Sequence, residues 1–322
     1  MKTVYRIFLL ILTLVILTVA AVPANAADYI KWVDFTPTAG AMWEAMEIDR
    51  KAHEEGKTVS FISLLALYSA EHGGNYGGYK KGDMQKLCDI CGEDDPSLHA
   101  ANPKLYEYYE NCYTAALGGM FGEYTKYTEK DGAVTAEKCY GFRAYSPVAA
   151  GYYYNHYDDF GASRSYGYKR NHLGHDLMGS VGTPIVAVEA GYVEACGWNR
   201  FGGWRIGIRS FDGKRYYYYA HLRRDHPYND IYEGKIVAAG EVIGYLGMTG
   251  YSTKENTNNI DTPHLHYGLQ LIFDKSQKDG TNQIWLDMYE ITKLLEKCRA
   301  VTVADEKERR SLTVSYPDSV WD

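Results

Sequence analysis

Three short histidine clusters in the second half of the chain have the composition of a metal site with catalytic groups beside it. Seven of the ten histidines fall between residues 156 and 266. The clusters are His172-Leu173-Gly174-His175-Asp176, Ala220-His221-Leu222 and His264-Leu265-His266. Imidazole is both a frequent zinc ligand and the side chain that titrates near neutral pH. A segment with these groups can hydrolyse an unactivated bond.

Spacing indicates how the first and last clusters could share one ion. Alternate residues of a strand share a face, so His264 and His266 are expected to point to the same side while Leu265 enters the core. One of the two histidines can bind a metal while the other stands beside the open coordination position. Asp176 and one histidine of its cluster would complete three ligands, the number that catalytic zinc sites use.

The other histidines of this segment are expected to play different parts. His221 ends a run of tyrosines and by alternation should share a face with Tyr217 and Tyr219. His175 adjoins Asp176, so it should point away from the ion and not bind it. Two histidines lack a partner pattern and are expected at the surface or the groove rim: His156 and His226.

A β-rich scaffold is expected to position these groups. From Gly141 onward, short β-type runs alternate with glycine-containing turns, and Asp212-Gly213 between two runs is a hairpin signal. The expected strands are 184–188, 192–195, 204–210, 215–221, 236–238 and 242–246. A helix is expected over 285–298, followed by a charged surface tail over 301–322.

The preceding residues, 27–140, are expected to form a small helical region. An apolar stripe starts at Phe61, with Ser60 as its N-cap and Gly73 as its stop. Asp83 could cap a second helix, and Pro103 suits the first turn of a third. Nothing in this region has catalytic spacing, and its role as targeting module, inhibitory segment or packing partner stays open.

The first 26 residues have the composition of a signal peptide. Lys2 and Arg6 precede an apolar run, and Ala24-Asn25-Ala26 is a small-x-small cleavage signal. We expect a secreted or cell-wall-associated protein with no membrane span after signal removal. An uncleaved, membrane-anchored form is the alternative.

Composition excludes one class of partner and leaves the cysteines open. A net charge of −7 and an isoelectric point near 5.8 argue against nucleic-acid binding, which needs a basic footprint. Six cysteines in an exported chain permit disulfides, but their positions on apolar helical stripes suit buried thiols equally well.

An ordered series of motifs over about residues 160–270 resembles the lysostaphin-type zinc metallopeptidases, which are peptidoglycan endopeptidases. The series comprises Phe160-Gly161, Arg164, His172-x-Gly174-x-Asp176, Gly182-Thr183-Pro184-Ile185, Tyr219-Ala220-His221-Leu222, Thr249-Gly250 and Pro263-His264-Leu265-His266. The resemblance implies zinc held by His172, Asp176 and His266, and catalytic histidines at His221 and His264. It also implies a mostly antiparallel sheet whose groove holds a peptide.

The chain departs from the family pattern chiefly in an asparagine-rich insertion over 254–262, which should form a longer loop beside the groove. The sequence as a whole predicts an α+β protein: a mainly antiparallel β-sheet catalytic domain with an open groove over 141–300, preceded by a small helical domain. The expected function is zinc-dependent hydrolysis of peptide bonds in peptidoglycan stems or cross-bridges. His264 is expected to take the proton of the water, and His221 to donate to the developing oxyanion or steady it. The alternatives are a non-catalytic envelope scaffold and a zinc endopeptidase that acts on proteins.

Overall fold

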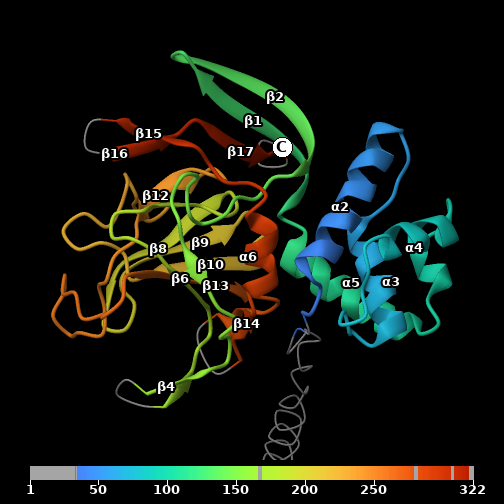
Figure 1. The fold of residues 1–322 in the computed structure, drawn as a ribbon, viewed down its shortest axis with the longest axis horizontal. Helices are drawn as coiled ribbons and strands as arrows, with labels where there is room; N and C mark the ends of the chain where they lie inside the picture. Colours follow the sequence, from blue (N-terminus) through green and yellow to red (C-terminus); the bar gives the residue numbers. More distant parts are fainter. Residues whose placement is uncertain (1–32, 34, 166–168, 279–281, 306–307, 319–322) are drawn as a thin grey trace, which may run out of the picture.

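The structure is a computed structural model that describes residues 33, 35–165, 169–278, 282–305 and 308–318 (Figure 1). The expected signal peptide lies outside these residues. None of the helices in the described part is both long and apolar enough to cross a bilayer.

Four α-helices and a short 3-10 helix form the first part of the described chain. They are α2 (Ala39–Glu54), α3 (Phe61–His72), α4 (Asp83–Cys91), η1 (Pro96–His99) and α5 (Pro103–Leu117). The expected ends of α3 are confirmed, because Ser60 Oγ accepts a backbone hydrogen bond and Gly73 stops the helix at a φ of +58°. Pro103 lies in the first turn of α5, as expected. The expected cap at Asp83 is wrong, since Asp83 is itself the first residue of α4.

The helical region ends earlier than the sequence indicated. Strands β1 (Phe121–Lys130) and β2 (Ala133–Phe142) form an antiparallel hairpin, and β17 (Thr313–Pro317) pairs with β1 to make a three-stranded sheet. The turn is Asp131-Gly132, with φ values of +52° and +81°. This Asp-Gly pair is the same hairpin signal that the sequence carries at residues 212–213.

The expected surface tail is also wrong. Besides β17, it contains β15 (Thr302–Asp305) and β16 (Glu308–Ser311), which pair with each other. Ser315 of β17 is buried and exchanges backbone hydrogen bonds with Ala239. The tail therefore closes one side of the β-domain (Figure 1).

The main sheet has eight strands, and all of its pairings are antiparallel, which confirms the expected α+β class. The order is β11-β8-β9-β10-β13-β6-β3, with β14 paired to β13. These strands are β3 (Asn155–His156), β6 (His175–Met178), β8 (Gly191–Asn199), β9 (Gly203–Ser210), β10 (Arg215–Ala220), β11 (Ile236–Val237), β13 (His264–Leu271) and β14 (Ile284–Leu286). Two smaller pairs flank it, β7 (Pro184–Val186) with β12 (Val242–Tyr245) and β4 (Ser163–Arg164) with β5 (Arg170–Asn171). All six expected strands are present, and the β9–β10 hairpin turns at the predicted Asp-Gly pair.

The expected helix over 285–298 is shorter than its apolar pattern. α6 covers Tyr289–Leu295, whereas residues 284–286 extend as β14 against β13. Pairing with an available sheet edge has overridden the local helical periodicity. All six cysteines lie in the described residues and are free thiols.

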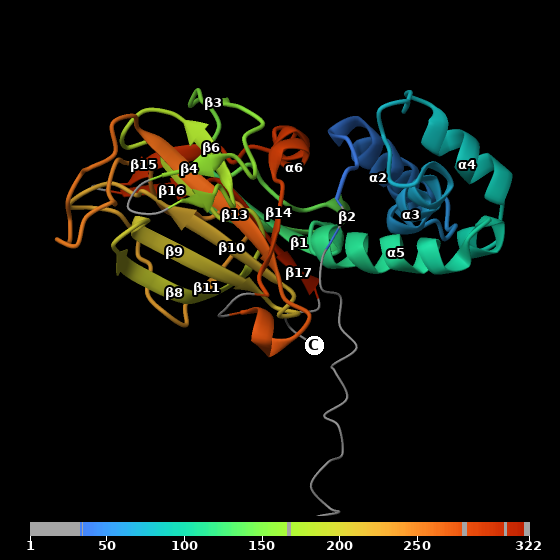
Figure 2. The same cartoon turned by 90° about the horizontal axis from the view of Figure 1, so that it is seen from below.

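The helical region packs directly onto the β-domain (Figure 2). Ala39 N at the start of α2 donates a hydrogen bond to Glu290 Oε2 of α6 (2.7 Å). Arg215 of β10 is 2% exposed; its Nη1 donates to Ala115 O of α5 (2.8 Å), and its Nε pairs with Glu189 (2.8 Å). A buried guanidinium that serves both regions fixes one against the other.

Candidate metal centre

Three neighbouring strands bring the predicted ligands together. In the β6–β13 pair, Asp176 lies directly opposite His266. His172 follows the short strand β5 and turns back toward the same face. Gly174 makes this approach possible, because a Cβ there would lie 2.5 Å from the His266 ring. Directly opposed residues in an antiparallel pair are the closest that two strands offer.

The three side chains converge on one point. His266 Nδ1 lies 2.9 Å from Asp176 Oδ1 and 3.0 Å from His172 Nε2. His172 Nε2 lies 3.1 Å from the same Asp176 oxygen. Within the described residues, this trio forms a potential metal-binding group with one ligand atom from each side chain. The structure thus gathers the residues that were predicted as ligands.

The charges in this trio favour a bound cation. Burial acts to raise the pKa of Asp176, but hydrogen bonds from His172 and His266 outweigh it and hold the pKa well below its usual value. Burial acts to lower the pKa of His172, but the bond and charge of Asp176 raise it overall. An ionised carboxylate that is 9% exposed needs a positive partner.

Two residues that the spacing argument assigned no role hold the trio in place. His172 Nδ1 lies 3.3 Å from Asp159 O, so that nitrogen can donate to the carbonyl and leave Nε2 bare for a metal. Arg164 Nη2 pairs with Asp159 Oδ2 (2.5 Å) and reaches Asp176 Oδ2 (3.4 Å). Outer partners of this kind fix the tautomer and orientation of metal-binding side chains. Only the position of Arg164 in the family series hinted at this role.

The two predicted catalytic histidines stand beside the trio. The rings of His221 and His264 lie 4.8 Å apart, and His264 Nε2 is 3.8 Å from Asp176 Oδ1. His221 Nδ1 lies 2.8 Å from Thr249 O, and His264 Nδ1 lies 2.8 Å from Thr262 O. Each backbone carbonyl therefore fixes the Nδ1–H tautomer, which leaves each Nε2 as a bare acceptor.

Both of these imidazoles are held neutral. Burial, followed by the charges of His264 and His266, lowers the pKa of His221 to about 3. Burial also lowers the pKa of His264. Groups in this state are unprotonated at neutral pH and offer Nε2 as a hydrogen-bond acceptor.

The expected alternation of His221 with Tyr217 and Tyr219 is wrong. Both tyrosines are fully buried on the other face, where their hydroxyls bond to Glu189 (2.8 Å) and Val188 N (3.0 Å). His221 lies just beyond the end of β10 at a φ of +60°, and this left-handed residue breaks the alternation. Tyr218 instead lines the metal-site cavity with His221.

The remaining histidines form a separate arrangement behind the sheet. His175 points away from the trio, as expected, and is fully buried with its Nε2 2.8 Å from His156 Nδ1. Burial, and then the charge of His156, lowers the pKa of His175 to about 4. The expected surface position of His156 is wrong, because its side chain is 14% exposed and covers His175. His226 lies against Tyr245, with ring centroids 5.3 Å apart.

A groove runs across this face of the sheet. The cavity over the trio, of about 220 Å³, is lined by all five predicted site residues together with Arg170, Tyr218 and Tyr251. A neighbouring cavity of about 530 Å³ extends to Asn259, Ile260 and Asp261. The loop over 254–262 therefore walls the groove, as predicted.

The helical region contributes nothing to this groove in the described chain. The residues that line the cavities over and beside the trio all lie at or after Arg164.

Relatives of known name match part of the chain. The chain is 36% identical over 166 residues to an L-Ala--D-Glu endopeptidase of Bacillus subtilis, covering 51% of this chain and 47% of that protein. It is 38% identical over 97 residues to lysostaphin of Staphylococcus simulans, covering 30% of this chain and 17% of that protein. The chain thus spans about half the length of the first relative and far less of the second.

The fold also matches a solved structure over most of its length. A Ruminococcus gnavus protein, described as a glycyl-glycine endopeptidase lytM, superposes with a TM-score of 0.53 at 21% identity, covering 83% of this chain and 90% of that one. Such coverage exceeds the β-domain, so the shared fold includes part of the helical region. Residues 170–279 match the model described as Peptidase family M23, and they carry all five predicted site residues. The comparison thus relates the β-rich segment over residues 170–279 to peptidase family M23.

Proposed function

We propose that this protein is a zinc-dependent endopeptidase that hydrolyses peptide bonds in the stems or cross-bridges of peptidoglycan. The observation that carries the proposal is the convergence of His172, Asp176 and His266 beside two neutral histidines. The match to peptidase family M23 and the endopeptidase names of the relatives support it. Since peptidoglycan lies outside the cytoplasm, we propose that the protein acts there after export.

The three proposed ligands fit a zinc ion. Their donor atoms lie 2.9–3.1 Å apart. Ligands bound to zinc at about 2.0–2.1 Å in a tetrahedron would lie about 3.3 Å apart, so binding needs only a small expansion. Two imidazole nitrogens and a carboxylate bring three lone pairs to one point. A bound cation can accept all three of them, whereas one proton shared among these atoms cannot.

The proposed chemistry divides between the ion and the two attendant histidines. A bound zinc ion polarises the scissile carbonyl and makes a nearby water molecule more acidic. His264 Nε2 faces the trio as a bare acceptor, so we assign it the proton of the attacking water.

The tautomer of His221 changes the role that we propose for this residue. His221 was expected to donate to the developing oxyanion or steady it, but its Nδ1–H is committed to Thr249 O and its Nε2 is unprotonated at neutral pH. His221 can therefore orient the water as a second acceptor, and it becomes a donor only after it has taken a proton. We propose that the imidazolium formed in the first step, at either histidine, supplies the proton that the departing amine requires.

The test combines metal content with bond cleavage. Purified protein should contain about one zinc ion and release new amino groups from cell-wall sacculi. His266→Ala should abolish both, whereas the matched change His99→Ala, in the helical region, should alter neither. Zinc-free wild-type protein, or a His266→Ala protein with full activity, would contradict the proposal. Cleavage of glycine-rich proteins without release from sacculi would favour the protein-directed alternative.

A further inference from the structure

A second, larger cavity continues the groove away from the 254–262 loop. It measures about 680 Å³ and shares Leu173, Tyr218 and His266 with the cavity over the trio. Its floor is the face of strands β9, β10 and β13. A substrate held at the trio can therefore extend into it.

One residue of this cavity, Arg205, lies in the same cross-strand row as the proposed ligands. Ala220 pairs with His266, and His266 pairs with Asp176. The β9–β10 register pairs Ile206 with Tyr219, so its next step places Arg205 opposite Ala220. Arg205 and His266 are thus two strands apart, or about 10 Å between backbones.

Arg205 is the unpaired cation of this cavity. Glu194, the carboxylate among its lining residues, already pairs with Arg209 (2.8 Å) and Lys278 (2.7 Å). The Arg205 side chain forms no ion pair or hydrogen bond with the residues that the structure describes, although its backbone oxygen accepts one from Tyr228. A cavity with three cations and one carboxylate attracts a further negative group.

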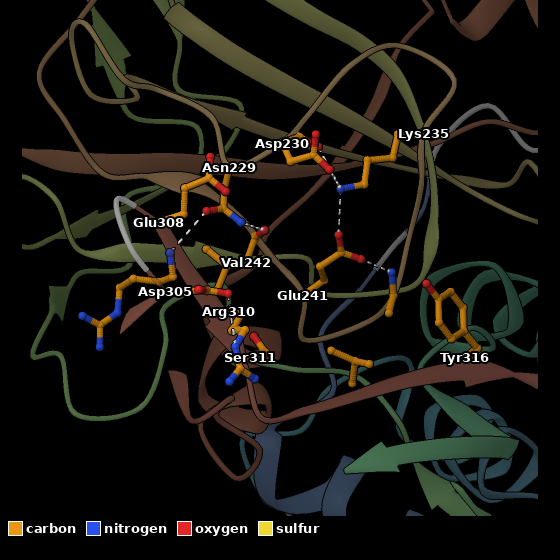
Figure 3. Close-up of a pocket in the computed structure, with 13 residues that line it drawn as sticks. Asn229, Asp230, Lys235, Glu241, Val242, Asp305, Glu308, Arg310, Ser311 and Tyr316 are labelled. Carbon is orange, nitrogen blue, oxygen red and sulfur yellow. Dashed lines mark hydrogen bonds and ion pairs between the residues drawn. The ribbon is translucent and has the colours of Figure 1, made fainter. Parts of the chain in front are cut away.

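A surplus of cations over carboxylates is not found in every cavity, as the cavity near β15 and β16 shows. That cavity, of about 720 Å³ near β15 and β16, also has many charged residues, but Figure 3 shows several of them paired with one another. Lys235 bridges Asp230 and Glu241 (3.1 Å each), and Arg310 contacts Asp305 (3.3 Å). Its cations therefore already have partners within the protein, since Arg309 also bonds to Thr302 (3.2 Å).

Aromatic side chains make the Arg205 cavity a defined binding surface. Tyr216 lies over Gly207, where a Cβ would collide with the tyrosine ring. Tyr218 and Trp285 line the same cavity, and Tyr218 hydroxyl accepts a hydrogen bond from Asn199 Nδ2 (3.1 Å). Apolar walls around a guanidinium strengthen its attraction for a carboxylate.

We propose that Arg205 binds a carboxylate of the peptide substrate, two or three residues from the scissile bond, and so selects acidic peptides. The spacing follows from the separation of about 10 Å and an extended chain that advances about 3.3 Å per residue. A planar guanidinium can hold a carboxylate through two parallel hydrogen bonds, which a carboxamide cannot reproduce. The proposal rests on the endopeptidase function and specifies its substrate.

The test uses paired peptides that differ in one charge. Mass spectrometry of sacculus digests first identifies the bond that is cut. Synthetic peptides around that bond then carry either glutamate or glutamine at the second or third position on either side. Wild-type protein should cleave one acidic peptide with a kcat/KM about 10- to 100-fold above its amide partner, which corresponds to a hydrogen-bonded charge pair. The preference should appear mainly in KM, since Arg205 lies away from the reacting bond.

Variants assign that preference to Arg205. Arg205→Gln should bring the ratio of kcat/KM for the acidic and amide peptides to about 1, and Arg205→Lys should retain part of the preference. The matched control Arg224→Gln, at an exposed arginine outside the groove-lining residues, should keep it in full. Equal cleavage of both peptides by the wild type, or a preference that survives Arg205→Gln, overturns the proposal.

Calorimetric binding separates this proposal from the function on which it rests. If no peptide is cut, tighter binding of the acidic peptide to zinc-loaded wild type than to Arg205→Gln would retain the carboxylate site and reject the endopeptidase assignment. Equal binding would reject the carboxylate site.

Discussion

Replacing Gly174 with alanine should damage the metal centre without touching a ligand. The added Cβ would lie 2.5 Å from Cε1 and Nε2 of His266 and 3.0 Å from the backbone oxygen of Tyr267. Carbon atoms pack no closer than about 3.5 Å, so the His266 ring must shift by about 1 Å. The backbone oxygen of Tyr267 is also close to the added Cβ, so the backbone at residue 174 cannot move instead of the ring. Gly174 is not among the left-handed glycines, so the effect is steric.

Such a shift has a defined cost. Disturbing the groups that orient a ligand lowers metal affinity by about 10- to 100-fold, and a 1 Å misplacement of reacting groups can cost about 100-fold in rate. We expect Gly174→Ala to weaken zinc binding by about 10- to 100-fold. At saturating zinc, it should lower kcat/KM by about 100-fold. Zinc affinity is measured by competition with a chromogenic chelator, and activity by amine release from sacculi.

The matched control is Gly78→Ala, because an added Cβ there meets nothing within 4 Å. It should leave zinc affinity and activity unchanged. A Gly174→Ala protein with wild-type melting temperature, zinc affinity and rate would refute the reasoning. The position of the His266 ring would then not require a glycine at residue 174.

Three further predictions concern protonation and burial. The pKa of His172 is raised in the metal-free protein, so zinc must displace a proton and its affinity should fall about tenfold per pH unit below that pKa. The pKa values of His221 and His264 are lowered and their neutral forms are the active ones, so kcat/KM of the zinc-saturated enzyme should decline only below pH 6.5. Arg215→Met would leave Glu189 buried and unpaired, and the free energy of unfolding should drop by about 3–5 kcal/mol in urea titrations.

Each of these outcomes has a clear counter-result. Zinc affinity that does not change between pH 5.5 and 8 would contradict the His172 linkage, as would calorimetry without proton release. A loss of activity already above pH 7, with zinc retained, would contradict neutral bases. Arg224→Met, at an exposed pair with Asp225, should leave stability unchanged, and an equal loss in both variants would argue against the burial of Arg215 as the cause.

Local patterns were sufficient for part of the sheet around the metal centre, but the ligand-bearing strand β6 was not among the expected strands. Alternation and glycine punctuation predicted β7 to β12, and the strand period placed His264 and His266 on one face. The β-hairpin over 121–142 was missed although Asp131-Gly132 carries the appropriate turn signal, because the neighbouring helices suggested that the whole region was helical.

Other features depend on contacts that no local pattern contains. The pairing of His156 with His175 joins residues 19 apart through a β3–β6 bridge. Tyr218 enters the groove in place of its neighbours because the register with β13, not the tyrosine run itself, sets which face meets His266. The positive φ of His221 likewise belongs to the turn after β10.

The pairing of β17 with β1 imposes an order on assembly during synthesis. The hairpin of residues 121–142 emerges from the ribosome long before residues 313–317, which complete its sheet. Until then, the long edge of β1 is open to pairing with other chains, and unpaired edges of this kind promote aggregation. Loss of residues 313–317 would thus impair solubility through a strand about 190 positions away.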